Sequence, residues 1–298
     1  MRLVVTGSQG QVVRALIERA GPELEIVALG RPELDLEHPG DLAALFSRHA
    51  PDAIVNAAAY TAVDKAESER ETAFAVNGAG AGAVAAAARR LNVPVVQIST
   101  DYVFDGSGDR PLRETDPTGP IGVYGASKLA GEQAVAAAAP DHVILRTAWV
   151  YAPFGANFVR TMLRLAAARD ELKVVGDQFG TPTSALDIAA AIESVARHLV
   201  ARRDAARLRG IFHMTAKGGP ISWADFAAEI FRQSALRGGP GARVTAIPTS
   251  EYPTPARRPA WSCLDGGKLA AIHGVTLPDW RDALAQTIER LAAQGEWQ

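Results

Sequence analysis

The segment Tyr124-Gly125-Ala126-Ser127-Lys128 holds a phenol and an ammonium one helical turn apart. Residues i and i+4 share a helix face, so both groups point into the same space. A free phenol has a pKa of about 10, and a neighbouring ammonium lowers that pKa toward neutral pH. We therefore predict that Tyr124 transfers a proton and that Lys128 tunes its pKa.

Thr100 lies directly after an apolar run, residues 94–99, that is typical of a buried strand. In open parallel sheets, ligands bind beyond the carboxyl ends of the strands. A hydroxyl at this place can hydrogen-bond a substrate carbonyl while Tyr124 delivers the proton. Thr100 taken alone is more typical of a turn cap, but its order with Tyr124 and Lys128 favours a catalytic role.

A glycine loop, Thr6-Gly7-Ser8-Gln9-Gly10-Gln11-Val12-Val13, joins the first predicted strand to the first predicted helix. Glycines let the backbone turn tightly and approach a pyrophosphate, which then lies at the helix N-terminus. A plain strand–helix turn is the alternative, but the position in the first strand–helix unit favours a dinucleotide. We predict that Gly7 and Gly10 contact this cofactor.

The second predicted strand ends at Leu29-Gly30-Arg31, where a carboxylate for the ribose hydroxyls of NAD is missing. Arg31 offers a fork for a 2′-phosphate instead, which favours NADPH, with NADH also possible. A solvated arginine is the alternative. Asp35 and Leu36 follow and are candidates for the adenine edge.

Short β-branched runs alternate with Ala-rich stretches, as in a parallel sheet that is covered on both faces. The predicted strands are 2–6, 25–29, 52–56, 94–99, 142–147 and 210–215. The predicted helices that accompany them are 11–20, 39–49, 71–91, 124–139 and 184–202. Repeated strand–helix units form right-handed crossovers. The predicted fold is therefore α/β, a doubly wound parallel sheet of the Rossmann type.

A second, smaller α/β lobe is predicted because the pattern changes after Trp149 and becomes richer in Pro, Trp and Gly from Gly218. Its predicted helices are 157–168, 222–236 and 280–293. We assign 1–148 with 184–217 to an NADP-binding domain, and 149–183 with 218–298 to a substrate-binding lobe. The two are interleaved, so no clean linker separates them.

The composition argues against several classes of protein. The 298 residues carry a net charge of −2 without a basic stripe, which argues against nucleic-acid binding. Neither a signal peptide nor an apolar run of about 18 residues is visible. Cys263 is the single cysteine and the six histidines are scattered, so we expect neither a disulfide nor a metal site. We expect a cytoplasmic monomer or homodimer.

Several segments together carry a family resemblance that covers essentially the whole chain. They are the glycine loop, Asn56-Ala57-Ala58-Ala59-Tyr60-Thr61, Ser99-Thr100-Asp101-Tyr102-Val103-Phe104, Tyr124 to Lys128, Arg146-Thr147-Ala148-Trp149-Val150-Tyr151, Asp177-Gln178-Phe179-Gly180-Thr181-Pro182-Thr183 and Pro255-Ala256-Arg257-Arg258-Pro259. The chain resembles the extended short-chain dehydrogenase/reductases, and within them the branch that reduces dTDP-4-dehydrorhamnose. The resemblance implies NADPH-dependent reduction of the 4-keto group of dTDP-4-dehydro-β-L-rhamnose, the last step of dTDP-L-rhamnose synthesis.

The resemblance also implies which residues bind the ligands. Those for the cofactor are Gly10, Gln11, Val12, Asp35, Leu36, Ala59, Tyr60 and Thr61, together with Tyr124 and Lys128. Those for the dTDP-sugar are Thr100, Asp101 and Trp149. The family usually has a glycine where this chain has Val13, and we hypothesise that the valine weakens cofactor binding.

Two rival functions stay open. One is another nucleotide-sugar ketoreductase or epimerase. The other is a non-catalytic regulatory subunit similar to the β-subunit of methionine adenosyltransferase.

Several single residues also have two interpretations. Arg257 and Arg258 fit a pyrophosphate clamp and a salt-bridged loop equally well. Asn77 is a candidate for orienting a water near Lys128. Trp223 is interpreted as packing or surface, and the stretch from Asp64 to Glu67 as the first turn of a helix.

Overall fold

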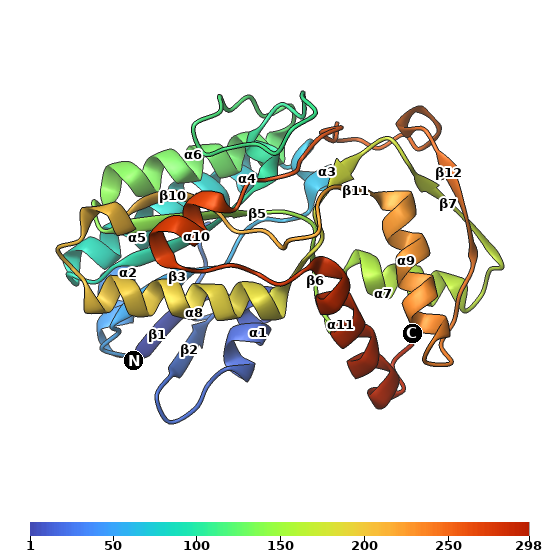
Figure 1. Cartoon of the computed structure of the whole chain (residues 1–298). Coiled ribbons are helices and arrows are strands. Elements are labelled where there is room, and N and C mark those ends of the chain that lie inside the picture. The colour runs from blue at the N-terminus through green and yellow to red at the C-terminus, as the bar shows by residue number, and fades with distance from the viewer. Residues whose placement is uncertain (298) are drawn as a thin grey trace.

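The computed structural model describes residues 1–297 and is built on one six-stranded parallel sheet (Figure 1). The strand order is β10-β5-β4-β3-β1-β2. Its strands are β1 (Arg2–Thr6), β2 (Glu25–Leu29), β3 (Ala53–Asn56), β4 (Val95–Thr100), β5 (His142–Thr147) and β10 (Gly210–His213). Every strand predicted for the sheet is present, and the predicted doubly wound α/β fold is confirmed.

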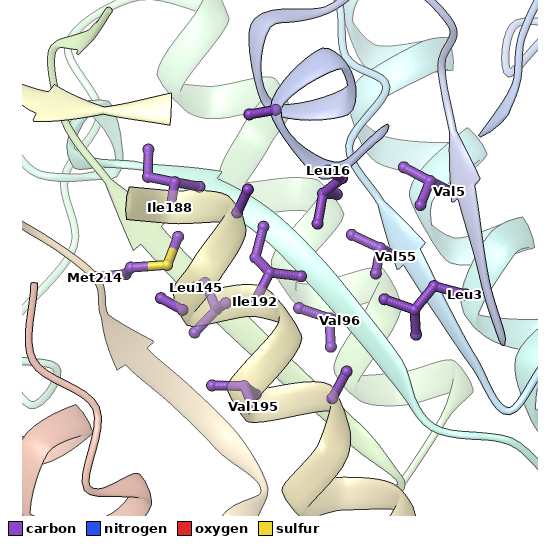
Figure 2. Packing of buried hydrophobic residues seen from close by; sticks show 14 of the residues in the cluster. Leu3, Val5, Leu16, Val55, Val96, Leu145, Ile188, Ile192, Val195 and Met214 are labelled. Atoms are coloured by element: carbon purple, nitrogen blue, oxygen red, sulfur yellow. The ribbon is translucent and has the colours of Figure 1, made fainter. Parts of the chain in front are cut away.

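Both faces of the sheet are covered by helices, because successive strand residues point to opposite sides. Leu3 and Val5 of β1 join the cluster that packs under α1 (Gln11–Glu18) and α8 (Ala185–Ala201). Val4 joins the opposite cluster. The helices of that second face are α2 (Leu42–Ser47), α5 (Ala81–Arg90) and α6 (Val123–Ala138). Figure 2 shows Leu3, Val5, Val55 and Val96 of the strands against Leu16 of α1 and Ile188, Ile192 and Val195 of α8.

The helix predicted at 71–91 is in fact three consecutive segments. These are α4 (Arg70–Phe74), the π-helical segment η1 (Ala75–Gly80) and α5. A short helix, α3 (Val63–Ala66), precedes them. Wide π turns are uncommon and occur frequently at functional sites. This one lies against α6, the helix that carries Tyr124 and Lys128.

The smaller lobe lies beyond the sheet in the chain's second half, at the right of Figure 1. Its main elements are α7 (Phe158–Ala166), β7 (Glu171–Val175), α9 (Trp223–Ala235), β12 (Arg243–Ile247) and α11 (Trp280–Gln294). Its short elements are β6 (Val150–Tyr151), β8 (Phe179–Gly180), β9 (Thr183–Ser184), β11 (Ile221–Ser222) and the 3₁₀ turn η4 (Thr249–Glu251). Two further 3₁₀ turns, η2 (Asp101–Val103) after β4 and η3 (Ala206–Leu208) after α8, belong to the main domain. The lobe has its own core, in which Tyr151, Phe226 and Trp280 are completely or almost completely buried.

The expected assignment of all of 218–298 to the smaller lobe needs a correction. Helix α10 (Gly267–His273) packs on α8 and the edge strand β10, and its Leu269 belongs to the core cluster of the sheet. Leu277 lies in the same cluster. The chain therefore returns to cover the edge of the sheet before it forms α11. Within residues 1–297, no helix is long and apolar enough to cross a membrane.

Candidate active site

A cavity of about 530 Å³ opens where β1, β2 and β3 end. The crossovers reverse direction between β1 and β3, which is where open parallel sheets bind ligands. Six of the predicted cofactor residues line this cavity: Gly7, Arg31, Asp35, Leu36, Ala59 and Tyr60. The predicted Gly10, Gln11, Val12 and Thr61 lie outside its wall. The residues of the wall that sequence reasoning did not select are Ser8, Gln9, Gly30, Leu34, Glu37, Ala58, Glu69, Thr72 and Val76.

The glycine loop has the geometry that a dinucleotide requires. Gly7 has φ +95°, a backbone conformation that favours glycine. At Gly30, a Cβ would lie 2.5 Å from Ser8 Oγ, so the loop packs directly over that glycine. At Gly10, which caps α1, the nearest atom to a Cβ would be Val13 Cγ2 at 3.7 Å. The neighbours do not require glycine there, so its missing side chain leaves clearance for a ligand at the helix N-terminus.

Arg31 is paired with acidic residues at the rim of this cavity. Its guanidinium lies 3.0 Å from Asp35 Oδ1 and 3.5 Å from Glu37 Oε2, and its side chain is 64% exposed. The hydrogen bond from Arg31 lowers the pKa of Asp35. A 2′-phosphate would therefore compete with two carboxylates for this guanidinium. Tyr60, on the opposite wall, donates to Glu69 Oε2 at 2.5 Å.

Thr100 and Tyr124 meet at the end of β4. Thr100 Oγ1 donates to Asp101 Oδ1 at 2.9 Å and accepts from the Tyr102 backbone N–H at 3.3 Å, so it is also the turn cap. Burial raises the pKa of Tyr124 to about 12, and the hydrogen bond with Thr100 opposes this rise. The Tyr102 ring packs edge-on against Tyr124, 5.5 Å between centroids.

The groups that set the pKa of Tyr124 in the structure are its burial, Thr100 and Asp101, so the expected effect of Lys128 on this pKa stays a prediction. The lysine is 5% exposed and its Nζ donates to the Ile98 carbonyl at 2.7 Å. Burial lowers its pKa to about 8, against the effect of the Glu132 carboxylate, which raises it. Lys128 is therefore positively charged at neutral pH.

A ladder of buried polar side chains crosses the sheet from the glycine loop to Lys128. Thr6 donates to Asn56 Oδ1 at 2.5 Å, and Asn56 donates to Gln97 Oε1 at 2.7 Å. Gln97 in turn donates at 2.8 Å to the Ile98 carbonyl that also holds Lys128. The ladder fixes the end of β1, from which the glycine loop starts, relative to the Ile98 carbonyl that holds Lys128.

Two glycines of α6 have no side chain, so the backbone of this helix lies directly against the backbone of neighbouring segments. A Cβ on Gly125 would lie 2.1 Å from the Tyr102 carbonyl oxygen, and one on Gly131 would lie 2.0 Å from the Asn77 carbonyl oxygen. Neither distance is possible for a real side chain. These two contacts set the depth at which α6 presents Tyr124 and Lys128 to the sheet.

Asn77 is buried at 2% exposure, and its side chain is occupied by protein groups. Its Oδ1 accepts from the Tyr60 backbone N–H at 2.8 Å, and its Nδ2 donates to the Tyr60 carbonyl at 3.0 Å and to Ser127 Oγ at 2.9 Å. The expectation that it orients a water near Lys128 stays a prediction. Asn77 connects the wall of the cofactor cavity to α6.

A second cavity, of about 700 Å³, lies in the smaller lobe. Its apolar wall is formed by Phe158, Met162, Leu165, Leu172, Val174, Val175, Trp223 and Ile247. Its polar wall is formed by Thr161, Arg169, Glu171, Lys173, Gln178, Glu251, Tyr252, Thr254 and Arg258. An apolar surface with nearby cations suits a nucleotide, whose base is flat and whose phosphates are anionic.

Trp149, predicted to bind substrate, lies directly against Trp223, and its predicted role stays a prediction. Trp149 has φ +49°, and its ring stacks on Trp223 with 3.4 Å between centroids and 3° between planes. Its edge lies over Gly180, where a Cβ would be only 2.3 Å away. Trp223, expected to be packing or surface, lines the second cavity, and Trp149 stacks on it without being part of that wall.

Asp101, predicted to bind substrate, is 2% exposed beside Thr100. Its Oδ2 has no hydrogen-bond partner within residues 1–297. Burial raises its pKa to about 6, against the hydrogen bonds from Thr100 and Ser262. A buried carboxyl oxygen at this place is suited to a hydroxyl of a ligand.

The loop with Arg258 is tied to the main domain. Arg258 Nη2 lies 2.9 Å from Asp64 Oδ2, and the Ala256 backbone N–H donates to Asp64 Oδ1 at 3.2 Å. Glu67 accepts from the Val123 backbone N–H, where α6 begins, at 2.8 Å. Asp64 and Glu67 thus hold other segments, beyond the helix-turn role expected for them. Arg258 is salt-bridged, and its Nη1 is buried without a partner in the described part of the chain.

Comparisons with known proteins agree with this geometry. The sequence pattern of the family described as RmlD substrate binding domain matches residues 1–293. A dTDP-4-dehydrorhamnose reductase of Sinorhizobium fredii is 51% identical over 99% of each chain, and one of Escherichia coli is 41% identical over 98% of each. A crystal structure of a dTDP-4-dehydrorhamnose reductase of Bacillus anthracis in complex with NADP is 34% identical, with a TM-score of 0.89 over 97% of this chain and 99% of that one.

Proposed function

The chain belongs to the RmlD substrate binding domain family, and from this we propose that it reduces the 4-keto group of dTDP-4-dehydro-β-L-rhamnose with NADPH. The product is dTDP-L-rhamnose. The observation that carries the proposal is the meeting of Thr100, Tyr124 and Lys128 at the end of β4, in a chain 51% identical to a reductase of that name.

The residues at the ends of β1, β2 and β3 fit a dinucleotide, because the clearance at Gly10 and the turn at Gly7 leave backbone for a pyrophosphate. Gly7, Arg31, Asp35, Leu36, Ala59 and Tyr60 would hold its adenosine end. Gly10, Gln11, Val12 and Thr61 would contact its remainder. When bound, a reduced nicotinamide supplies a hydride to a carbonyl carbon.

The protein side of the reaction is the transfer of a proton to the carbonyl oxygen. A pKa of about 12 keeps Tyr124 protonated throughout the neutral range, which is the state that a proton donor requires. Thr100 orients the carbonyl oxygen toward the phenol. The Lys128 ammonium, charged below about pH 8, stabilises the phenolate that remains after the transfer.

The second cavity is our proposed place for the nucleotide of the substrate. The Trp223 face offers a stacking surface for the base, and the unpartnered Nη1 of Arg258 offers a donor for a phosphate oxygen. Arg258 also acts electrostatically on Tyr102, which packs against Tyr124, so the phosphate end of this cavity lies toward the catalytic residues. Asp101 and the sugar hydroxyls would meet between them.

The test is NADPH oxidation, followed by absorbance, with dTDP-4-dehydrorhamnose as substrate. We expect turnover by the wild type and a fall of about a hundredfold or more for Tyr124→Phe. Tyr151→Phe is the matched control, because the Tyr151 hydroxyl is buried in the core of the smaller lobe and donates to the Trp280 carbonyl. That control should keep wild-type turnover.

A wild type that binds NADPH but does not oxidise it with this sugar would disprove the proposal. Turnover with other 4-keto nucleotide sugars would then favour the ketoreductase or epimerase alternative. Solved epimerases such as that of Stenotrophomonas maltophilia, at 20% identity, share the fold alone.

A further inference from the structure

A buried ion pair lies directly behind the catalytic lysine. Tyr124, Lys128 and Glu132 follow one another at four-residue intervals on α6 and so share one face. Glu132 is 3% exposed and Arg146, on β5, is 2% exposed. Two parallel bonds join them: Arg146 Nε to Glu132 Oε1 at 2.9 Å and Arg146 Nη2 to Glu132 Oε2 at 2.7 Å.

A third group completes the environment of the Glu132 carboxylate. Ser99 Oγ donates to Glu132 Oε1 at 2.5 Å. Ser99 is paired in register with Arg146 across β4 and β5, and it directly follows Ile98, whose carbonyl accepts from Lys128 Nζ. The carboxylate is therefore fixed by the same strand that fixes the ammonium.

Stability alone gives a weak reason for this pair. Removing two charges from water costs so much that well-packed apolar side chains of similar volume are often equally stable or more stable. What an apolar pair would not supply is a negative charge one turn from a buried ammonium. The location of the pair is thus more informative than its strength.

Resting on the proposed reductase function, we propose that Glu132, held in place by Arg146 and Ser99, is a positioning residue that keeps the Lys128 ammonium charged and aimed at the reaction centre. Glu132 and Arg146 would act through Lys128, without contact to the ligands.

Burial disfavours the charged form of Lys128, and the Glu132 carboxylate opposes this effect. It lowers the pKa of Lys128 to about 8, and Glu132 is the charge that raises it. The other titratable or polar groups on its own helix and on the elements packed against it include Tyr124, Ser127, Asp101, Tyr102, Arg146, Gln97, Ser99, Thr100 and Asn77. Without the carboxylate, Lys128 would lose its proton at a lower pH, within the range where the enzyme must work.

The spacing explains why the carboxylate is not bonded to the ammonium itself. Lys128 Nζ is bonded to a neutral carbonyl, and the carboxylate is occupied by Arg146 and Ser99. A direct ion pair would tie up the ammonium that the phenolate and the cofactor need. At one helical turn, the charge still acts on the lysine and leaves its N–H groups for the ligand.

The experiment compares the wild type with Glu132→Gln and with the neutral double variant Glu132→Gln/Arg146→Gln. The single variant leaves a buried guanidinium without its counter-ion and is expected to be unstable. The double variant removes both charges and lets two amides pair with each other and with Ser99. For each protein, the melting temperature, the NADPH dissociation constant and the pH profile of kcat with dTDP-4-dehydrorhamnose are measured.

We expect the double variant to melt close to the wild type, while the alkaline limb of its kcat profile moves down by about one pH unit. Its NADPH dissociation constant should rise by severalfold because Lys128 is less charged. Glu18→Gln is the control, because Glu18 forms an equally close two-bond pair with Arg290 on the surface between α1 and α11. That variant should leave the alkaline limb unchanged.

A stable double variant with a wild-type pH profile and wild-type cofactor affinity would overturn the proposal and leave the pair a purely structural feature. If the double variant is unstable, its kcat is measured at low temperature and normalised to the folded fraction. An alkaline limb of this pH profile that coincides with the limb of the wild type again overturns the proposal. The proposed reductase function fails separately, when the wild type itself does not turn over.

Discussion

Gly131→Ala is expected to damage both the stability and the activity of this protein, although the residue touches no ligand. Helix propensity alone predicts the opposite, since alanine in a helix is favoured over glycine by up to about 1 kcal/mol. The structure overrules this preference, because a Cβ on Gly131 would lie 2.0 Å from the Asn77 carbonyl oxygen.

The size of the effect follows from that distance. Ordinary contact of a Cβ begins at 3.4 Å, so α6 or η1 must retreat by about 1.4 Å. Overpacking of this kind costs about 1–3 kcal/mol, which exceeds the gain in propensity. Lys128 lies one turn before Gly131, and Ser127 is bonded to Asn77. A shift of about 1 Å in catalytic groups reduces kcat by on the order of 100-fold.

The assay is urea unfolding together with kcat and KM for the 4-keto sugar. Gly78→Ala is the matched control, because it lies across the same interface and a Cβ there would be 3.6 Å from Ala130 Cβ, an ordinary contact. We expect the control to unfold within about 0.5 kcal/mol of the wild type. A Gly131→Ala protein that is as stable and as active as the wild type would refute the reasoning that backbone contact sets the depth of α6.

Three further predictions concern single side chains. Asp101→Asn should flatten the pH dependence of stability: the folded pKa of Asp101, about 6, lies above its ordinary 3.8, so the wild type loses about 2 kcal/mol as pH rises from 4 to 7. The free energy of unfolding of both proteins is measured by urea unfolding at pH 4 and pH 7, and an equal loss in the wild type and in the variant would contradict this. Arg258→Gln should raise KM for the dTDP-sugar about tenfold with little change in kcat; an unchanged KM would remove Arg258 from the proposed phosphate site. Val13→Ala should lower the NADPH dissociation constant in a fluorescence titration, and an equal or higher value would contradict the hypothesis that Val13 weakens cofactor binding.

The sheet was predictable because its physical cause is local. A strand such as Ala53–Asn56 is buried on both faces, so three of its four residues are apolar and the run is visible without knowledge of its neighbours. Loops that join such strands to helices are equally visible, and Gly7, Asp35 and Tyr60, which the sequence selected for the cofactor, line the cavity at the ends of these strands.

The smaller lobe was less predictable because its contacts join distant segments. Strands β7 and β12 pair although about 70 residues separate them, and each is short and half exposed. The sequence also does not show that Trp223 lines the second cavity, or that Trp149 stacks on it with a positive φ. No pattern of residue types in the sequence predicts the φ angle of Trp149.

The π-helical segment explains why the candidate catalytic residues Tyr124 and Lys128 could be found in the sequence, while the contact that positions their helix could not. The spacing of Tyr124 and Lys128 is a property of one helix, so the sequence displays it directly. Their position depends on how closely α6 meets η1, and that contact exists because a wide turn brings the Asn77 carbonyl against a glycine. The same turn aims the Asn77 side chain at Tyr60, in the wall of the cofactor cavity. A change at this turn therefore acts on cofactor binding and on proton transfer together. Variants of Asn77 should raise the NADPH dissociation constant and lower kcat.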